Sequence, residues 1–360
     1  MRQIMLTVRP LLLCAVLLGA MATQPARSVE ATGMHSSADC DRLCLRSMAD
    51  RLVTSIARHD PAVLPLASTY AATENGVPAA LPMMSTWQIA SGTGGRFYAI
   101  DSVSHQVFFM VSMREGVADA LIFGRFRLKQ RRFSEIELYV DRSRGDGGFM
   151  FDGTGPGHFP SVWTQQIPRS RLPSRSALIR AGRAMFDPSV AGLPIAPYCR
   201  LMENGRLVAE DPKVLKWVDP GGNGLHPNPD GTLPIPCGLP PNRPVDPLAR
   251  LVVADTQAGI VISIATVQGV VQPYLITKPT VSAFIPLSLL RPYMDMLRHQ
   301  RAAGVFTLPA LRGMRASNTT VQMWRIFDGK LQAMQLLEHL QPPSAASPWT
   351  APTTPDGSIQ

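Results

Sequence analysis

Two hydrophobic patterns follow one another in the first half of the chain. Between Asp39, a capping residue, and Arg58, the apolar residues Leu43, Met48, Leu52 and Ile56 recur near helical spacing, which predicts an amphipathic helix. A short helical piece at 61–68 follows, and then strands separated by turn residues at 96–100, 106–113, 118–129 and 133–140. A helix before an antiparallel meander predicts a two-layer α+β domain of roughly 100 residues.

The same patterns return in the second half. Residues 68–76 and 197–205 both end in Glu-Asn-Gly, 96–107 matches 250–261, and 126–139 matches 324–337. The offset between matched residues grows from 129 (Glu74 to Glu203) to 198 (Phe133 to Leu331). The chain is therefore predicted to hold two diverged copies of one domain, with insertions in the second.

The repeat and the local composition predict where each segment of the chain begins and ends. We expect the first copy at 38–143, a Gly/Pro-rich linker at 144–173, the second copy at 174–341 and a disordered tail at 342–360. Within the second copy, 218–247 is predicted to be an irregular loop and 288–303 an added amphipathic helix.

The first residues predict export. Arg2 and Arg9 flank the start of an apolar run at 11–18, and Ala20-Met21-Ala22 follows as a cleavage pattern. This run is shorter than the roughly 20 residues that a membrane span needs. We therefore expect a signal peptide at 1–22 and a periplasmic or secreted protein without a membrane span.

Charge and cysteine content narrow the function classes. The net charge is +9 and the positive residues are scattered along the chain. Their densest group, at 125–132, fits a half-exposed strand, so we expect no nucleic-acid binding.

Four cysteines follow the predicted signal peptide and allow three pairings, of which we favour the local bridges Cys40–Cys44 and Cys199–Cys237. No CxxC pair or neighbouring His supports a metal site, and no nucleotide, dinucleotide or hydrolase motif supports a cofactor.

Several motifs of the first copy resemble one family. They are His59-Asp60-Pro61 at a helix end, Tyr70 with Thr73-Glu74-Asn75-Gly76, Trp87, and Arg127-Leu128 with Glu135-Ile136-Glu137. Together they resemble the SnoaL-like group of the nuclear-transport-factor-like superfamily, and the first copy resembles an exported domain of that group more closely than the second does. The resemblance implies two tandem cone-shaped domains, each a curved antiparallel sheet with helices on its concave face around a mostly apolar pocket.

The same resemblance argues against ordinary isomerase chemistry. In the superfamily's ketosteroid isomerases an aspartate is the base, and a tyrosine and a protonated aspartic acid form the oxyanion hole. Carried onto this chain, the base falls at or beside Asn75 and again at Asn204, the tyrosine near Leu52 and the acid near Gly124. None of these side chains can perform those roles.

Candidate site residues remain in both copies. Glu74, His59 and His226 are the acid–base candidates, although a Glu before an Asn-Gly turn is often only solvated and a His at a helix end often only terminates the helix. The expected ligand-pocket residues are Tyr70, Trp87, Tyr98, Arg127, Tyr198, Glu203, Trp217, Tyr274 and Trp324. The repeated pairs Arg96 with Asp101 and Arg250 with Asp255 are interpreted as ion pairs or turn bonds that fix a strand.

Two functions fit these observations. The first is an exported pocket protein that binds an apolar or aromatic small molecule, and the second is a cofactor-free lyase, isomerase or hydratase acting on such a molecule. A purely structural role stays open, as do a homo-oligomer and packing of the two domains on each other. The 218–247 loop is expected either to cover the second pocket, bringing His226 or Asp246 close to it, or only to cap a sheet edge.

Overall fold

The structure is a computed structural model of the chain. It describes residues 40–142, 161–207, 209–210, 233–234, 236–237, 246, 248–271, 298–305 and 314–349. All of them belong to one compact unit, residues 38–360. The predicted signal peptide lies outside the described residues, as do most of the 218–247 loop and of the predicted 288–303 helix, of which 298–302 are helical. Within the described part, no helix combines the length and the apolar character that a membrane crossing requires.

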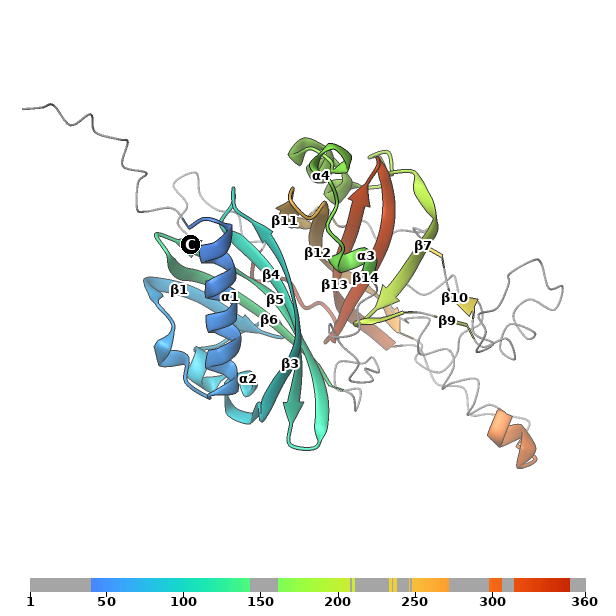
Figure 1. The fold of residues 1–360 in the computed structure, drawn as a ribbon. Helices are drawn as coiled ribbons and strands as arrows, with labels where there is room; N and C mark the ends of the chain where they lie inside the picture. Colours follow the sequence, from blue (N-terminus) through green and yellow to red (C-terminus); the bar gives the residue numbers. More distant parts are fainter. Residues whose placement is uncertain are drawn as a thin grey trace, which may run out of the picture. The chain divides into compact units, whose positions relative to one another are not determined.

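The first sheet contains six strands in the order β2-β1-β6-β5-β4-β3 (Figure 1). Their bounds are β1 Leu66–Glu74, β2 Val77–Pro78, β3 Gly92–Asp101, β4 Gln106–Glu115, β5 Ala118–Lys129 and β6 Arg132–Arg142. The accompanying helices are α1 Arg42–Ala57, η1 Pro61–Val63, η2 Leu81–Met83 and α2 Ser85–Ile89. β1 runs parallel to β6, and the other neighbours are antiparallel.

The second sheet repeats this topology, with the order β11-β12-β13-β14-β7-β8 and a parallel pair of β7 and β14. Its strands are β7 Ile195–Glu203, β8 Arg206–Leu207, β11 Arg250–Asp255, β12 Ile260–Val271, β13 Met314–Phe327 and β14 Lys330–Gln341. α3 Ser161–Thr164, η4 Arg169–Arg171 and α4 Arg175–Ala184 precede it, and β9 Ala209–Glu210 pairs separately with β10 Leu233–Pro234. The matched sequence blocks therefore occupy equivalent strands, here called the first and second repeat.

The predicted fold class, a curved antiparallel sheet with helices on its concave face in each copy, is wrong for both the sheets and the helices. Both sheets are mixed rather than antiparallel, and strands predominate over the few helices. The sequence interpretation placed a helical piece at 61–68 and missed β1, because only one of the nine residues of this strand is fully buried and its apolar alternation is weak. After α1 the chain enters the sheet beside its last strand and in the same direction, which produces the parallel pair.

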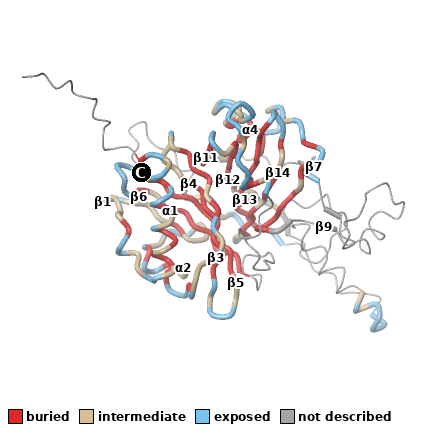
Figure 2. The backbone as a smooth tube through the Cα atoms, in the orientation of Figure 1, coloured by how far each residue is buried: buried red, intermediate tan, exposed pale blue. Residues whose placement is uncertain are grey.

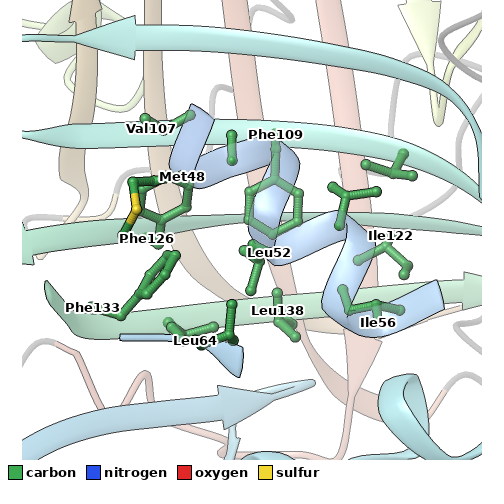
Figure 3. Packing of buried hydrophobic residues seen from close by; sticks show 14 of the residues in the cluster. Met48, Leu52, Ile56, Leu64, Val107, Phe109, Ile122, Phe126, Phe133 and Leu138 are labelled. Carbon is green, nitrogen blue, oxygen red and sulfur yellow. The ribbon is translucent and has the colours of Figure 1, made fainter. Parts of the chain in front are cut away.

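The core of the first repeat lies between α1 and one face of the sheet. Asp41 caps the helix by accepting a hydrogen bond from the backbone N–H of Cys44 (2.8 Å), two residues after the predicted cap. Met48, Leu52 and Ile56 then point at the apolar side chains of the strands (Figure 3). Most residues of the central strands are buried (Figure 2).

The other faces of the two sheets share a second hydrophobic cluster. It contains Phe108 and Phe123 of the first repeat and Ile262 and Met323 of the second, and all four side chains are 0% exposed. A third cluster lies between α4 and the remaining face of the second sheet. Each sheet therefore packs on a helix with one face and on the other sheet with the opposite face.

Two arginine–aspartate pairs cross between the repeats. Arg42, the first residue of α1, donates two hydrogen bonds of 2.9 Å to the Asp255 carboxylate. Arg175, the first residue of α4, donates bonds of 2.6 and 2.9 Å to the Asp101 carboxylate. The two pairs are equivalent by the repeat, and we call them the clasp.

Backbone groups complete the clasp with the same symmetry. Asp255 accepts from the N–H of Ile100 at 2.9 Å, and Asp101 accepts from the N–H of Ala254 at 3.2 Å. Burial by itself would raise the pKa of Asp101, but hydrogen bonds from Arg175 and Ser104, together with the Arg175 charge, hold it below its ordinary value.

The interpretation of Arg96–Asp101 and Arg250–Asp255 as local ion pairs is therefore wrong, but both aspartates do form the turn bonds that the sequence offered as the alternative. Asp101 accepts from the N–H groups two and three residues further on, and Asp255 does the same. Arg96 instead pairs with Asp50 of α1 at 3.2 Å. Arg250 crosses to the first repeat and donates to the buried Glu137 at 2.7 Å. Repetition of the two aspartates reflects an interface between the repeats, which a strand-by-strand interpretation does not detect.

Both predicted disulfides are confirmed. Cys40 and Cys44 are bonded with a Cα–Cα distance of 5.3 Å, and Cys199 and Cys237 are bonded at the same distance. Two disulfides fit an exported protein, since such bonds persist in oxidising compartments.

Candidate functional site

Glu74 has a structural position in the first repeat. Its carboxylate accepts hydrogen bonds of 2.8 Å from the backbone N–H groups of Ser85 and Thr86 and another from the Thr86 hydroxyl. These contacts hold the first residues of α2, where a carboxylate complements the free N–H groups of a helix start. The geometry thus accounts for Glu74 without a substrate.

His59 lies at the end of α1. Its φ of 57° turns the chain out of the helix, its N–H donates to the carbonyl of Ile56 (3.0 Å), and the residue is exposed. This is the helix-terminating position that the sequence offered as the alternative to catalysis.

Within the described ranges, the predicted pocket residues of the first repeat, and Tyr198 of the second, have separate surroundings. Trp87 is buried and donates from its indole to Ser55 (3.1 Å), and Tyr98 donates to Asp50 (2.9 Å). Tyr70 packs against the core, Arg127 lies 3.5 Å from Glu135 with its side chain 43% exposed, and Tyr198 is 86% exposed. Trp217, His226 and Tyr274 lie outside the described residues. The predicted pocket residues that remain are Glu203 and Trp324.

Glu203 and Trp324 lie on the face of the second sheet that corresponds to the α1-covered face of the first. In the first repeat Ile122 of β5 pairs with Val140 of β6, and in the second Thr320 of β13 pairs with Glu338 of β14. Both positions differ by the 198 residues that separate the matched blocks. The strand register therefore identifies equivalent side chains residue by residue.

This comparison shows a change from apolar to polar side chains. Alternate residues of a strand share a face, so β13 presents Asn318, Thr320, Gln322 and Trp324 together. The corresponding residues of β5 are Ala120, Ile122, Gly124 and Phe126, and Val140 of β6 is replaced by Glu338. All five second-repeat residues are buried, at most 6% exposed. We call these five residues and Glu203 the polar face.

Three atoms of the polar face lack hydrogen-bond partners. They are Oδ1 of Asn318, Oε1 of Gln322 and Nε1 of Trp324, and none of them is exposed. A buried polar atom without a partner costs about 1–3 kcal/mol. Residues 120–126, the equivalent stretch of the first repeat, hold no such atom.

Glu338 is the ionisable centre of the polar face. Burial raises the pKa of its carboxyl well above the ordinary value, and the nearby carboxylates of Glu203 and Asp141 raise it further, against a hydrogen bond from Asn318. Its backbone N–H donates to Oδ1 of Asn204 at 3.1 Å, as Val140 does to Asn75 in the first repeat. The Asn-Gly turn therefore fixes the strand that carries this carboxyl.

The helix over the second sheet is shorter than its counterpart. α1 and α4 both begin with a clasp arginine, but α1 has 16 residues and α4 has 10. Ile56, in the last turn of α1, lies beside Ile122 (Figure 3). α4 makes its main strand contacts with β11 and β12, as α1 does with the equivalent strands β3 and β4.

A separate cavity of about 500 Å³ lies where β12 and β13 end near the C-terminal segment 343–347. Asp246 lines it, although its carboxylate already accepts hydrogen bonds from the N–H groups of Leu248 (2.8 Å) and Thr266 (3.0 Å). Arg315 is the cation that lines it. Of the residues that the sequence placed at or near a pocket, Asp246 lines this cavity, and its lining residues hold none of the unpartnered buried atoms.

Comparison with known proteins assigns this chain to no family. No family model matches the chain, and no curated protein matches it either. Within the described part of the chain, no group of three or more His, Cys, Asp or Glu side chains could hold a metal ion.

The sequence interpretation missed most of the polar face. It matched 133–139 with 331–337 and therefore stopped one residue before Glu338 replaces Val140. Asn318, Thr320 and Gln322 precede the start of the same block at Trp324. Extending the match along the strands in both directions would have exposed the substitutions.

Proposed function

We propose that this protein is exported, to the periplasm or the cell exterior, and binds a small organic molecule at the polar face of its second repeat. The observation that supports this proposal is the row of unpartnered buried atoms on Asn318, Gln322 and Trp324 beside Glu338. Pockets for small molecules combine apolar walls with a few convergent polar groups. The row occurs where the first repeat has an ordinary apolar core.

This proposal changes the kind of ligand expected. An apolar or aromatic body suits the surrounding side chains, such as Leu336 and Met334, which belong to the same hydrophobic cluster as Trp324. The unpartnered atoms additionally call for a ligand with hydrogen-bonding groups, because an entirely apolar molecule would leave them unsatisfied.

Native mass spectrometry of the protein purified from its own host tests the proposal. We expect a retained small molecule on the wild type and its loss from Gln322→Leu, which removes one unpartnered oxygen. Gln332→Leu is the matched control, because Gln332 lies on β14 and its amide already donates to the carbonyl of Phe327 (3.0 Å). Retention by all three proteins, or by none, would contradict the assignment to the polar face.

A cofactor-free lyase, isomerase or hydratase is the second candidate. The observation that favours it is the raised pKa of Glu338 beside a second carboxyl group, Glu203, since acid–base enzymes use carboxyl pairs whose pKa values differ. In that case the mass of the retained molecule would change on incubation with the wild type and stay constant with Glu338→Gln.

A further inference from the structure

We propose that the cavity at the ends of β12 and β13 is a second binding site, for a short peptide whose two ends are both free. In this site Asp246 binds the ammonium group of the peptide and Arg315 binds its carboxylate. The site is separate from the polar face, and the inference does not depend on the function proposed for that face. It follows from the size of the cavity, from the segment that forms one of its walls and from the two charged side chains that line it.

The cavity has the size of a ligand site. Its volume of about 500 Å³ falls within the range of about 300–1,000 Å³ that pockets for small molecules occupy. Part of its lining comes from Thr266, Gln268 and Arg315 on neighbouring strands, and another part comes from the C-terminal segment 343–347. The small residues of the lining are Gly269, Ala316, Ala345 and Ala346. Such residues leave room for the main chain and short side chains of a peptide.

The C-terminal segment is fixed in place as a wall of the cavity. The side-chain amide of Gln268 donates to the carbonyl of Ala345 (3.0 Å), and its oxygen accepts from the N–H of Ser344 (3.2 Å). Just beyond the segment, the indole of Trp349 donates to the hydroxyl of Thr73 in the first repeat (3.1 Å). Hydrogen bonds to both repeats therefore hold the wall.

Two side chains of opposite charge line the cavity. The carboxylate of Asp246 accepts hydrogen bonds from the backbone N–H groups of Leu248 and Thr266, which leave its negative charge uncompensated. A carboxylate has about four acceptor positions, so two of them stay available. Among the described residues, none forms a hydrogen bond or an ion pair with the guanidinium of Arg315. Each end of a ligand can therefore find a charged group.

The two charged residues are held about 13 Å apart along the sheet. Asp246 is bonded to Thr266, whereas Arg315 is the register partner of Val270, four residues further along β12. The ammonium and carboxylate of a free amino acid are attached to the same carbon, so they cannot reach both residues. An extended peptide of three or four residues spans about 10–14 Å and can reach both.

A peptide with free ends supplies both complementary groups. Its ammonium carries three N–H donors for the carboxylate of Asp246, and its carboxylate can accept two parallel hydrogen bonds from the planar guanidinium of Arg315. A dicarboxylate would bring a second negative charge towards Asp246, and a diamine would bring a second positive charge towards Arg315. Like charges disfavour both of these alternatives.

Peptides of different length and with blocked ends test the inference on the intact protein by titration calorimetry. The ligands are trialanine and tetraalanine, the short control is alanyl-alanine, and the blocked controls are N-acetyl-tetraalanine and tetraalanine amide. We expect trialanine or tetraalanine to bind at least 10-fold more tightly than alanyl-alanine. Each blocked peptide should bind about 10-fold more weakly than tetraalanine, because it lacks one charge-assisted hydrogen bond. These controls change only the ligand and leave the protein fold untouched.

A variant tests the end of the site that binds the carboxylate. Arg315→Gln should weaken tetraalanine binding about 10-fold, yet it should bind tetraalanine amide as the wild type does, because the amide has no carboxylate for the guanidinium. Arg46→Gln is the matched control, since Arg46 is exposed on α1 and is not part of the cavity lining. It should leave the binding of every peptide unchanged.

Three results would overturn the peptide assignment: no binding by trialanine and tetraalanine, equal affinity for free and blocked peptides, or unchanged tetraalanine binding by Arg315→Gln. Gln322→Leu, which alters the polar face, should leave tetraalanine binding unchanged, and its loss in that variant would place the peptide outside the cavity. Conversely, Arg315→Gln should still retain the molecule expected at the polar face. The two sites can therefore fail separately.

Discussion

The buried polar side chains of the second repeat lower its stability where the first repeat has apolar packing. Asn318, Gln322 and Trp324 each leave one buried atom unpartnered, and Glu338 resists ionisation. Natural proteins commonly retain such groups at functional sites, where activity rather than stability determines the residue. Substitutions at these positions should therefore affect stability and binding in opposite directions.

Glu338→Gln should stabilise the protein at neutral pH. Because the pKa of Glu338 is raised in the folded state, both states hold the proton below the ordinary value of about 4.3 and the carboxyl has no effect on stability there. As the pH rises above that value, the unfolded state loses the proton first and the wild type loses stability. The Tm advantage of Glu338→Gln should be near zero at pH 4 and should increase towards pH 8.

Thermal unfolding of both proteins between pH 4 and pH 8 measures this difference. Glu137→Gln is the control, because its Tm difference from the wild type should change with pH in the opposite direction. Burial opposes its charge, but Arg125 and Arg250 hold the pKa of Glu137 below the ordinary value, so its stabilising effect is present at neutral pH and is lost on acidification. A Tm difference for Glu338→Gln that does not vary with pH would show that its carboxyl is not the perturbed group.

Sequence alone identified only part of the candidate site. Glu203 and Trp324 were predicted as pocket residues, because the repeat and the aromatic side chain marked them. The remaining members lie on strands whose apolar alternation is interrupted by polar residues, and such residues are normally assigned to a solvated face. Only the register between β13 and β14 shows that this face is buried.

The turns after β1 and β7 are the elements that the sequence described best. Asn75 and Asn204 have φ values of 54° and 44°, and each side chain accepts a hydrogen bond from the last strand of its sheet. The Asn-Gly pair predicted a turn, and the repeat predicted that it occurs twice. What the sequence did not predict is the parallel strand before each turn, because parallel pairing depends on where α1 and α4 return the chain.

Asn204→Ala should destabilise the protein by about 2–4 kcal/mol. The change leaves the buried N–H of Glu338 unpaired, at about 1–3 kcal/mol, and puts alanine, which lacks the local hydrogen bonding that lets asparagine tolerate it, in a left-handed conformation, at about 1–2 kcal/mol. Asn204→Gly should lose only the first contribution. Urea unfolding measures both variants.

The first repeat provides the matched control for this turn. Asn75→Gly removes the equivalent bond to Val140 and should destabilise to a similar extent, yet leave ligand retention unchanged. If Asn75→Gly and Asn204→Gly reduce retention equally, the turn acts through global stability and not through the position of Glu338.

The two disulfides close loops of very different length. The Cys199–Cys237 bond spans 38 residues and the Cys40–Cys44 bond spans 4. On chain-entropy grounds the first stabilises by about 4 kcal/mol and the second by about 2 kcal/mol. Urea unfolding of the Cys199→Ser/Cys237→Ser and Cys40→Ser/Cys44→Ser proteins should reproduce this order, and a reversed order would contradict the entropic explanation.

At the scale of the whole molecule, the clasp and Glu137 connect the two sheets. Arg42→Ala should destabilise by about 2–3 kcal/mol, because it leaves the Asp255 carboxylate, 0% exposed, without the cation that is hydrogen-bonded to it. Arg175→Ala should have a similar effect through Asp101. A double-mutant cycle of Arg42→Ala with Asp255→Asn measures the coupling by urea unfolding.

The exposed Arg171–Asp328 pair is the control for the clasp. It has the same residue types and two hydrogen bonds, but both side chains are more than 40% exposed. Arg171→Ala should therefore leave the free energy of unfolding nearly unchanged. Equal effects of Arg42→Ala and Arg171→Ala would mean that burial does not strengthen the clasp.

The crossed clasp has a further consequence for how the two halves can change. Two separate identical subunits could form the same arginine–aspartate contacts with each other, but every substitution would then occur at both symmetric positions. In one chain, Ile122 and Val140 can stay apolar while Thr320 and Glu338 differ. Fusion thus permits a division of labour, in which one half maintains the fold and its twin is free to acquire chemistry.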